Sequence, residues 1–216
     1  AMPSGRAALT ERRGVTDWGA QNRLEEDLRA LRSMGIRLDL LFNANCYGGR
    51  GVSQYLENQV ISLLEHLGSV AGGVDAVTTT SLTVARTVKR HFQAVEVRAS
   101  VNMRIGTVQG MNYVAGLFDS FIVQRDYNRD LNHLAGLKEW ADLNGKKLLL
   151  LANSGCLAFC SGQTFHDNLV AHEQEIDETI NIPGWTPMVC WNLLRKRENW
   201  PIILQATWIR PEDLNR

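Results

Sequence analysis

Apolar stripes at helical spacing alternate with short strand-like runs along nearly the whole chain, and this alternation constrains the fold more than any other feature. Leu24, Leu28 and Leu31 recur three or four residues apart, and the strand-like run IRLDLLF follows them. The same pair of patterns, a helix and then a strand, recurs along the chain. Such strict alternation predicts parallel strands covered by helices, which is an α/β fold.

We expect about six strands, which start near residues 37, 74, 95, 118, 147 and 201. Each connection between them is long enough for a helix, as parallel pairing requires. The expected architecture is therefore a TIM-barrel-like parallel (β/α) fold. A closed barrel needs eight strands, so we expect this one to be incomplete or open. Open sheet edges need covering, which favours a homodimer or a hetero-complex.

Length and composition indicate an ordinary globular protein. The 216 residues are 44% hydrophobic and 21% charged, with 23 basic and 23 acidic side chains. We expect an irregular N-terminal arm over residues 1–20 and one barrel-like domain over residues 21–216. The even charge balance argues against a surface that binds nucleic acid as a whole. Because the sequence shows neither a membrane span nor a secretory signal, we expect a cytoplasmic protein without a membrane partner.

Candidate metal-binding side chains are concentrated in residues 147–173. A short apolar run over residues 148–151 leads directly into Cys156 and Cys160. If the backbone is helical after Gly155, this four-residue spacing places both sulfurs on one face, where they could share a metal ion or a cluster. Two buried structural thiols are the simpler alternative. Since thiols stay reduced in the cytoplasm, we expect free cysteines or metal ligands, not disulfides.

Polar side chains follow nearly every expected strand, and in parallel βα folds the active site forms at these carboxyl ends. Cys46 follows the first strand, Arg125 the fourth and Arg210 the last. In a barrel these groups converge on one mouth, where Cys46 comes within reach of Cys156 and Cys160. The guanidinium groups of the two arginines would suit a small carboxylate there. Ion pairs with neighbouring acidic residues are the alternative.

Zinc is the alternative metal, because two cysteines and two histidines near each other match a Cys2His2 set. However, His166 and His172 would lie about 240° apart around a helix, which disfavours a shared ion. His166, which is close to the cysteine loop, is the better candidate for a role beside the metal ligands. Five aromatic residues are candidates for stacking on an aromatic substrate or a nucleobase, with RNA as a further partner: Tyr47, Phe159, Phe165, Trp185 and Trp191.

Five motifs occur in a recognisable order: VDAVTTTSLTVARTVKRHF, VEVRASVNM, FIVQRDYNRDL, NSGCLAFC and ATWIRPEDL. Together they resemble the family historically labelled peptidase U32, over roughly residues 37–214. Members look like TIM-barrel proteins. Those that are understood resemble oxygen-independent hydroxylation enzymes with a [4Fe-4S] cluster on four cysteines. Known relatives act on RNA bases or on a ubiquinone precursor, and prephenate is implicated as the source of the hydroxyl group.

The resemblance implies that Cys156, Cys160 and Cys190, with Cys46 as the fourth ligand, hold a [4Fe-4S] cluster. The implied function is hydroxylation of an aromatic or nucleobase substrate, by this chain alone or as a subunit. Arg125, Arg210 and His166 are then the catalytic candidates. A peptidase of the U32 type or a zinc-binding, non-catalytic protein is the alternative. The sequence has no H-E-x-x-H or G-x-S-x-G motif, so a peptidase would need a thiol nucleophile such as Cys160 beside His166.

Overall fold

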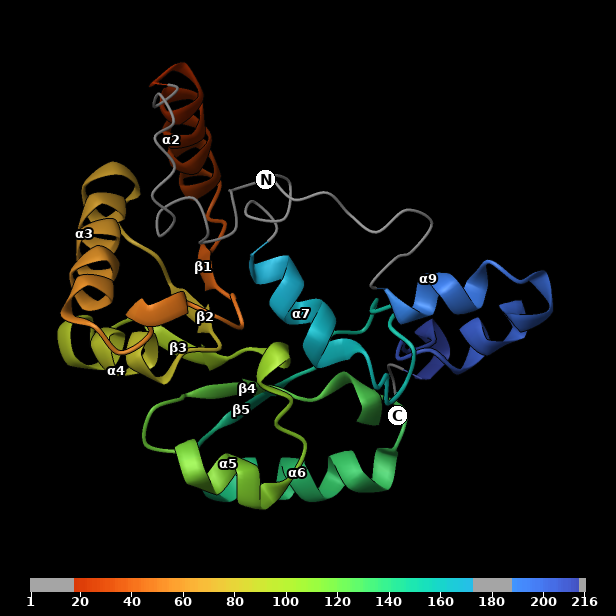
Figure 1. Cartoon of the computed structure of the whole chain (residues 1–216). Helices are drawn as coiled ribbons and strands as arrows, with labels where there is room; N and C mark the ends of the chain where they lie inside the picture. Colours follow the sequence, from red (N-terminus) through yellow and green to blue (C-terminus); the bar gives the residue numbers. More distant parts are fainter. Residues whose placement is uncertain (1–17, 173–187, 214–216) are drawn as a thin grey trace. The chain divides into compact units, whose positions relative to one another are not determined.

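The structure, a computed structural model, describes residues 18–172 and 188–213 (Figure 1). These residues form two compact units. Of the described chain, residues 18–99 and 116–119 make up the first unit, and residues 100–115, 120–172 and 188–213 make up the second. Both units are built from alternating helices and parallel strands, so the α/β prediction is confirmed. The single domain expected over residues 21–216 stays a prediction.

The first unit contains a parallel sheet of three strands. β1 (Asp39–Phe42), β2 (Ala76–Thr79) and β3 (Glu96–Ala99) pair in this order. The register places Leu40 beside Val77, and Val77 beside Val97. All three side chains are buried, which gives the sheet a continuous apolar row.

Three helices precede or connect these strands: α2 (Trp18–Ser33), α3 (Gln54–Ala71) and α4 (Leu82–His91). The hydroxyl groups of Ser53 and Ser81 cap α3 and α4, since each accepts a backbone N–H of the first turn. Of the expected arm, residues 1–17 lie outside the described residues, while residues 18–20 already belong to α2. None of the described helices is both long enough and apolar enough to span a bilayer.

The second unit contains a pair of parallel strands, β4 (Ser120–Ile122) and β5 (Lys147–Leu149). Helices α5 (Val108–Val114) and α6 (Leu131–Leu143) lie side by side along one face of this pair (Figure 1). Trp140 of α6 packs edge-on against Phe121, with ring centroids 5.8 Å apart, and its indole N–H donates to Asn112 Oδ1 at 2.9 Å. This contact joins α5, α6 and β4 around one aromatic pair.

The second unit continues with α7 (Gln163–Ala171) and α9 (Val189–Leu194). The spacing of Phe165, Leu169, Ile176 and Ile180 predicts a helix here. α7 covers its first part, and the part beyond residue 172 lies outside the described residues. The strand expected near residue 201 does not form. Arg197–Gln205 is instead a 3-10 helix, η4, and only an isolated antiparallel bridge joins Ala206 to Leu157.

Local hydrogen bonds explain this difference. Pro201 has no N–H for a sheet ladder. The indole N–H of Trp200 donates to the Leu194 carbonyl and that of Trp208 to the Ile203 carbonyl, both at 3.0 Å. These contacts favour a tight local turn over extended backbone. The described residues thus hold five strands, fewer than the eight of a closed barrel.

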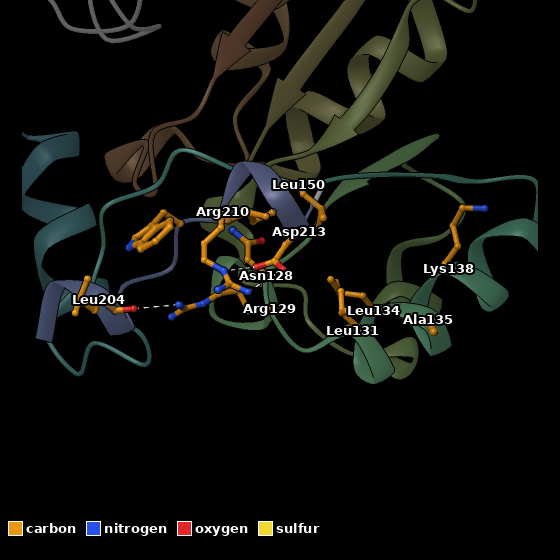
Figure 2. A pocket seen from close by; sticks show the side chains of 12 residues that line it. Asn128, Arg129, Leu131, Leu134, Ala135, Lys138, Leu150, Leu204, Arg210 and Asp213 are labelled. Carbon is orange, nitrogen blue, oxygen red and sulfur yellow. Dashed lines mark hydrogen bonds and ion pairs between the residues drawn. The ribbon is translucent and has the colours of Figure 1, made fainter. Parts of the chain in front are cut away.

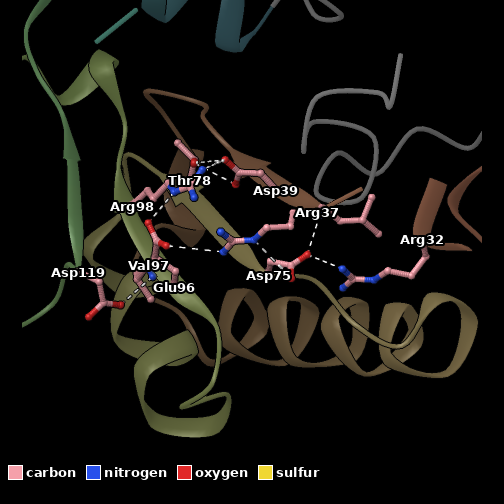
Figure 3. Close-up of polar contacts among 10 residues, drawn as sticks. Arg32, Arg37, Asp39, Asp75, Thr78, Glu96, Val97, Arg98 and Asp119 are labelled. Carbon is pink, nitrogen blue, oxygen red and sulfur yellow. Dashed lines mark hydrogen bonds and ion pairs between the residues drawn. The ribbon is translucent and has the colours of Figure 1, made fainter. Parts of the chain in front are cut away.

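Charged side chains pair with one another across the sheet of the first unit (Figure 3). Asp39 accepts hydrogen bonds from Arg98 Nη1 at 3.0 Å and from Thr78 Oγ1 at 2.8 Å. Arg98 Nε also donates to Glu96 at 2.8 Å, and this carboxylate is the main reason why the pKa of Arg98 is raised. The charges on this part of the sheet are therefore largely neutralised within the unit.

Asp75 ties the end of α2 to the start of β1 (Figure 3). Its carboxylate accepts the Leu38 N–H at 2.7 Å and Arg32 Nη1 at 2.5 Å. The backbone hydrogen bond from Leu38 is the largest cause that lowers the pKa of Asp75. A carboxyl group with a lowered pKa in the folded protein stabilises it above the pKa of the unfolded chain, and loses this effect as pH falls through the folded value.

We therefore expect Asp75→Asn to lower the free energy of unfolding by about 1 kcal/mol at neutral pH. The difference from the unchanged protein should shrink as the pH falls below about 4, because Asp75 then becomes protonated. Urea unfolding at a series of pH values measures both effects. A difference that stayed constant down to acidic pH would show that the charge of Asp75 does not contribute.

Candidate functional site

Arg125 lies where β4 ends, at the first residue of the 3-10 helix η3 (Arg125–Tyr127). Its side chain is only 9% exposed. Nη1 donates to Cys156 Sγ at 3.0 Å and Nη2 to Asn102 Oδ1 at 3.0 Å. Nε is buried and has no hydrogen-bond partner among the described residues. The sequence placed an arginine at this strand end, and the structure shows that its guanidinium group is turned inward, toward protein atoms.

The loop after β5 holds Cys156 in place. Ser154 is buried, and its Oγ accepts a hydrogen bond from Thr207 Oγ1 at 3.0 Å. The Thr207 N–H donates to the Cys156 carbonyl at 2.9 Å. The segment around residue 207 thus fastens the cysteine loop by side-chain and backbone hydrogen bonds, although it forms no strand.

Residues 156–160 are not helical, so their four-residue spacing does not place the sulfurs of Cys156 and Cys160 on one helical face. Phe159 has a left-handed backbone with φ of 52°, which an α-helix does not allow. The Phe159 N–H donates to the Asp126 carboxylate. This contact joins the loop to η3 and stabilises a turn at Phe159.

Cys160 and Cys190 lie on two segments that approach each other closely at Gly162. A Cβ atom at Gly162 would lie 2.6 Å from Val189 Cγ2 and 3.9 Å from Cys160 Sγ. Val189 is the first residue of α9 and the immediate neighbour of Cys190. The absence of a side chain at Gly162 therefore allows α9 to pack at the start of α7, close to Cys160.

Asp167 on α7 adds a carboxylate to the surroundings of Arg125. Burial raises the pKa of Asp167, while the charges of Arg125, His166 and Arg104 oppose this effect. Arg104 donates from Nη1 to Thr164 Oγ1 at 3.3 Å, which directs it toward α7. The result is a group of three cationic or titratable side chains around one carboxyl group whose proton is retained to a higher pH than usual.

Cys46 belongs to the first unit, whereas the other three cysteines belong to the second. It is half-buried in the loop after β1, and its Sγ accepts the Gly48 N–H at 3.4 Å. The neighbouring Tyr47 donates its hydroxyl to the Phe42 carbonyl at 2.6 Å, and burial raises the pKa of Tyr47 to about 12. Cys46 therefore follows a strand end, as the sequence predicted.

Arg210 is paired with acidic neighbours in its own segment. Its Nε and Nη2 donate to the two carboxylate oxygens of Asp213 at 2.6 and 2.9 Å, and Glu212 lies 3.8 Å away. Asp213 is the main reason why the pKa of Arg210 is raised. Arg210 lines a pocket with Asn128 and Arg129, and it lies outside the hydrogen-bonded group around Arg125.

A solved structure resembles this chain along most of its length. The alignment with the structure of the U32 peptidase Mk0906 spans 96% of this chain and 76% of that chain, with a TM-score of 0.66 and 17% sequence identity. The chain has a U32-like fold. No protein-family model and no curated protein matches the sequence. The structural likeness is consistent with the TIM-barrel-like parallel fold expected from the sequence.

The four cysteines of the chain fit an iron–sulfur cluster in number and chemistry. Cys46, Cys156, Cys160 and Cys190 are all half-buried thiols that form no disulfide. Within residues 18–172 and 188–213, no three His, Cys, Asp or Glu side chains are grouped so as to hold a metal ion. The cluster and the zinc alternative therefore both stay predictions.

Two features of the site could not be read from the sequence. The sequence pattern marks Arg125 as a residue after a strand, but not that its partners are Asn102 and Cys156. Asp167 was missed altogether, because a helix position next to His166 carries no signal of burial.

Of the aromatic candidates, Phe159, Phe165 and Trp191 are more than half exposed and remain available for stacking, whereas Trp185 lies outside the described residues.

Proposed function

We propose that this chain is a U32-like iron–sulfur protein that takes part in oxygen-independent hydroxylation of an aromatic or nucleobase substrate. It acts alone or as a subunit of a larger enzyme. Cys156, Cys160, Cys190 and Cys46 are the proposed cluster ligands. The observation that carries this proposal is the hydrogen bond from the buried Arg125 guanidinium group to the Cys156 sulfur, 3.0 Å long, at the strand end.

Charge complementarity supports the proposal. A cluster held by four thiolates carries net negative charge, and hydrogen bonds to its sulfur ligands adjust its reduction potential. Arg125 supplies a cation and an N–H donor to one such sulfur from a site with 9% exposure. The partner of Cys156 is thus an arginine and not the histidine that a thiol nucleophile at this position would need to take its proton. When bound, a cluster would supply one-electron chemistry.

The other residues of the site suit proton handling and anion binding. Asp167 has a raised pKa, so it can hold a proton at its carboxyl group under milder acidity than an ordinary aspartate. Arg104, whose Nη1 donates to Thr164 Oγ1 at 3.3 Å, is the proposed donor for a small carboxylate substrate. His166 contributes a further titratable group beside Asp167. An aromatic or nucleobase ring would stack on exposed aromatic residues such as Phe159.

Anaerobic reconstitution with iron and sulfide tests the proposal. We expect a brown protein that contains iron and sulfide in about equal amounts. Cys156→Ser and Cys160→Ser should each lose this colour and most of the bound iron. Ser161→Ala, an exposed change next to Cys160, is the matched control and should keep both. Circular dichroism of the apoproteins checks that the variants are folded.

Three other results would contradict the proposal. Protein that binds stoichiometric zinc and no iron above background would favour the zinc alternative. Peptide cleavage that requires a thiol and survives complete removal of iron would favour the peptidase alternative. Iron that stays bound after all four cysteines are replaced by serine would show that the ligands are wrongly assigned.

A further inference from the structure

A pocket of about 720 Å³ lies within the second unit, between α6 and the segment over residues 204–213 (Figure 2). Its volume falls within the usual range of small-molecule sites. It is separate from the hydrogen-bonded group around Arg125 and Cys156, and neither of these residues lines it. None of the proposed cluster ligands lines the pocket.

One wall of the pocket is apolar. Leu131, Leu134 and Ala135 come from a single face of α6, because they are three and four residues apart. Leu150, from the loop after β5, adds to this wall. Leu131 is 45% exposed and Leu150 is 42% exposed, although both side chains are large and apolar. An apolar group of a ligand would therefore remove a substantial apolar area from water here.

The other wall carries an excess of positive charge. Arg129 and Arg210 lie on this wall with a single carboxylate, that of Asp213, whereas Lys138 belongs to α6 and is paired with Asp142 at 2.6 Å. Arg129 Nη1 and Nη2 donate to the carbonyls of residues 204 and 206, and Arg210 donates twice to Asp213. A guanidinium group has five N–H donors, so each arginine keeps donors for a further acceptor. The charge and the spare donors favour an anionic group on the ligand.

Asn128 adds a third requirement. It is 3% exposed, and its Nδ2 donates to the carbonyls of Leu151 and Thr207 at 3.0 and 2.7 Å. Its Oδ1 is buried and has no hydrogen-bond partner among the described residues. Figure 2 draws this side chain together with those of Arg210 and Asp213, which line the same pocket. A buried acceptor without a donor is unfavourable, so a ligand that brings an N–H to this point gains from pairing with it.

We propose that this pocket binds the C-terminal residue of a peptide with an apolar side chain. Such a residue has an α-carboxylate for the arginines, a neighbouring amide N–H for Asn128 Oδ1 and a side chain for the leucine wall. A free amino acid fits less well, because its ammonium group would add a further cation near the guanidinium groups of Arg129 and Arg210. Capture of a C-terminal carboxylate by such donors is a known mode of peptide recognition.

N-acetyl-leucine is the minimal probe, and three analogues each remove one of its features. N-acetyl-leucinamide lacks the carboxylate, the O-acetyl ester of leucic acid lacks the amide N–H, and N-acetylglycine lacks the apolar side chain. We expect each analogue to bind at least about fivefold more weakly than N-acetyl-leucine by isothermal titration calorimetry or saturation-transfer NMR. An amide that binds as tightly as the acid would overturn the assignment of the arginine wall.

Two pairs of matched variants locate the binding. Leu131→Ala and Arg210→Gln change the two walls, whereas Leu143→Ala on the same helix and Arg195→Gln change exposed residues outside the pocket. The pocket variants should weaken N-acetyl-leucine binding about tenfold, and the control variants should leave it unchanged. Binding that is absent in the original protein, or equal in all four variants, would refute the proposal.

Discussion

Replacing Arg125 with methionine is expected to lower the free energy of unfolding by about 3 kcal/mol, because the change removes a buried cation from several polar partners. The guanidinium group donates to Asn102, to Cys156 and, at 3.5 Å, to Ser154. Methionine fills a similar volume but offers none of these atoms a donor. Urea unfolding of the two proteins at neutral pH measures the difference.

Arg195→Met is the matched control, since Arg195 is exposed in the same unit and its loss should change the unfolding free energy by less than about 0.5 kcal/mol. If Arg125→Met cost no more than this control, the buried hydrogen bonds of Arg125 would contribute nothing to stability. Such a result would also mean that Arg125 does not hold the Cys156 sulfur in place.

The same variant should change the titration of Asp167. Since the charge of Arg125 lowers the pKa of this carboxyl group against the effect of burial, its removal should raise the pKa further. A carboxyl group with a raised pKa in the folded protein favours folding at acidic pH and loses this effect as pH rises through the folded value. The cost of Arg125→Met should therefore be smaller at acidic pH. NMR titration of the Asp167 carboxyl carbon tests the shift directly.

Gly106→Ala should destabilise the second unit by about 2 kcal/mol, because no space exists for a side chain at this position. A Cβ atom there would lie 2.6 Å from Tyr127 Cε2 and 2.9 Å from Gln124 Oε1. Tyr127 cannot easily move aside, because its ring stacks on His133 at 4.1 Å and meets Phe159 edge-on at 5.8 Å. The measurement is again urea unfolding, with amide exchange of residues 124–127 as a local probe.

Gly136→Ala makes the same chemical change in α6, where nothing lies within 4 Å of the added Cβ. Because alanine favours a helix more than glycine, this variant should stabilise the protein by about 0.7 kcal/mol. Opposite signs for the two substitutions would confirm that packing against Tyr127 causes the loss at Gly106. A loss of equal size at both positions would point to a general effect of replacing glycine.

The sequence predicted the helices and strands best where the apolar period was long. Five of the expected strands are present, and helices connect them as the alternation predicted. The pattern failed in two short segments. The run after Pro201 was read as a strand, and the turn after Gly155 was considered as a helix. In both segments a few side-chain hydrogen bonds decide the backbone conformation, and these bonds leave no period in the sequence.

The sequence by itself determined the alternation of helices and parallel strands and the placement of Cys46, Cys156 and Arg125 after strands. Both follow from the local period of apolar residues and from the direction of the chain. Only the tertiary structure decided that Arg125 is buried against Cys156, that Asp167 lies in the same group and that Asn128 keeps an unpaired oxygen in a pocket. The Arg125 contacts join residues 23, 29 and 31 positions apart, so they depend on how whole elements pack.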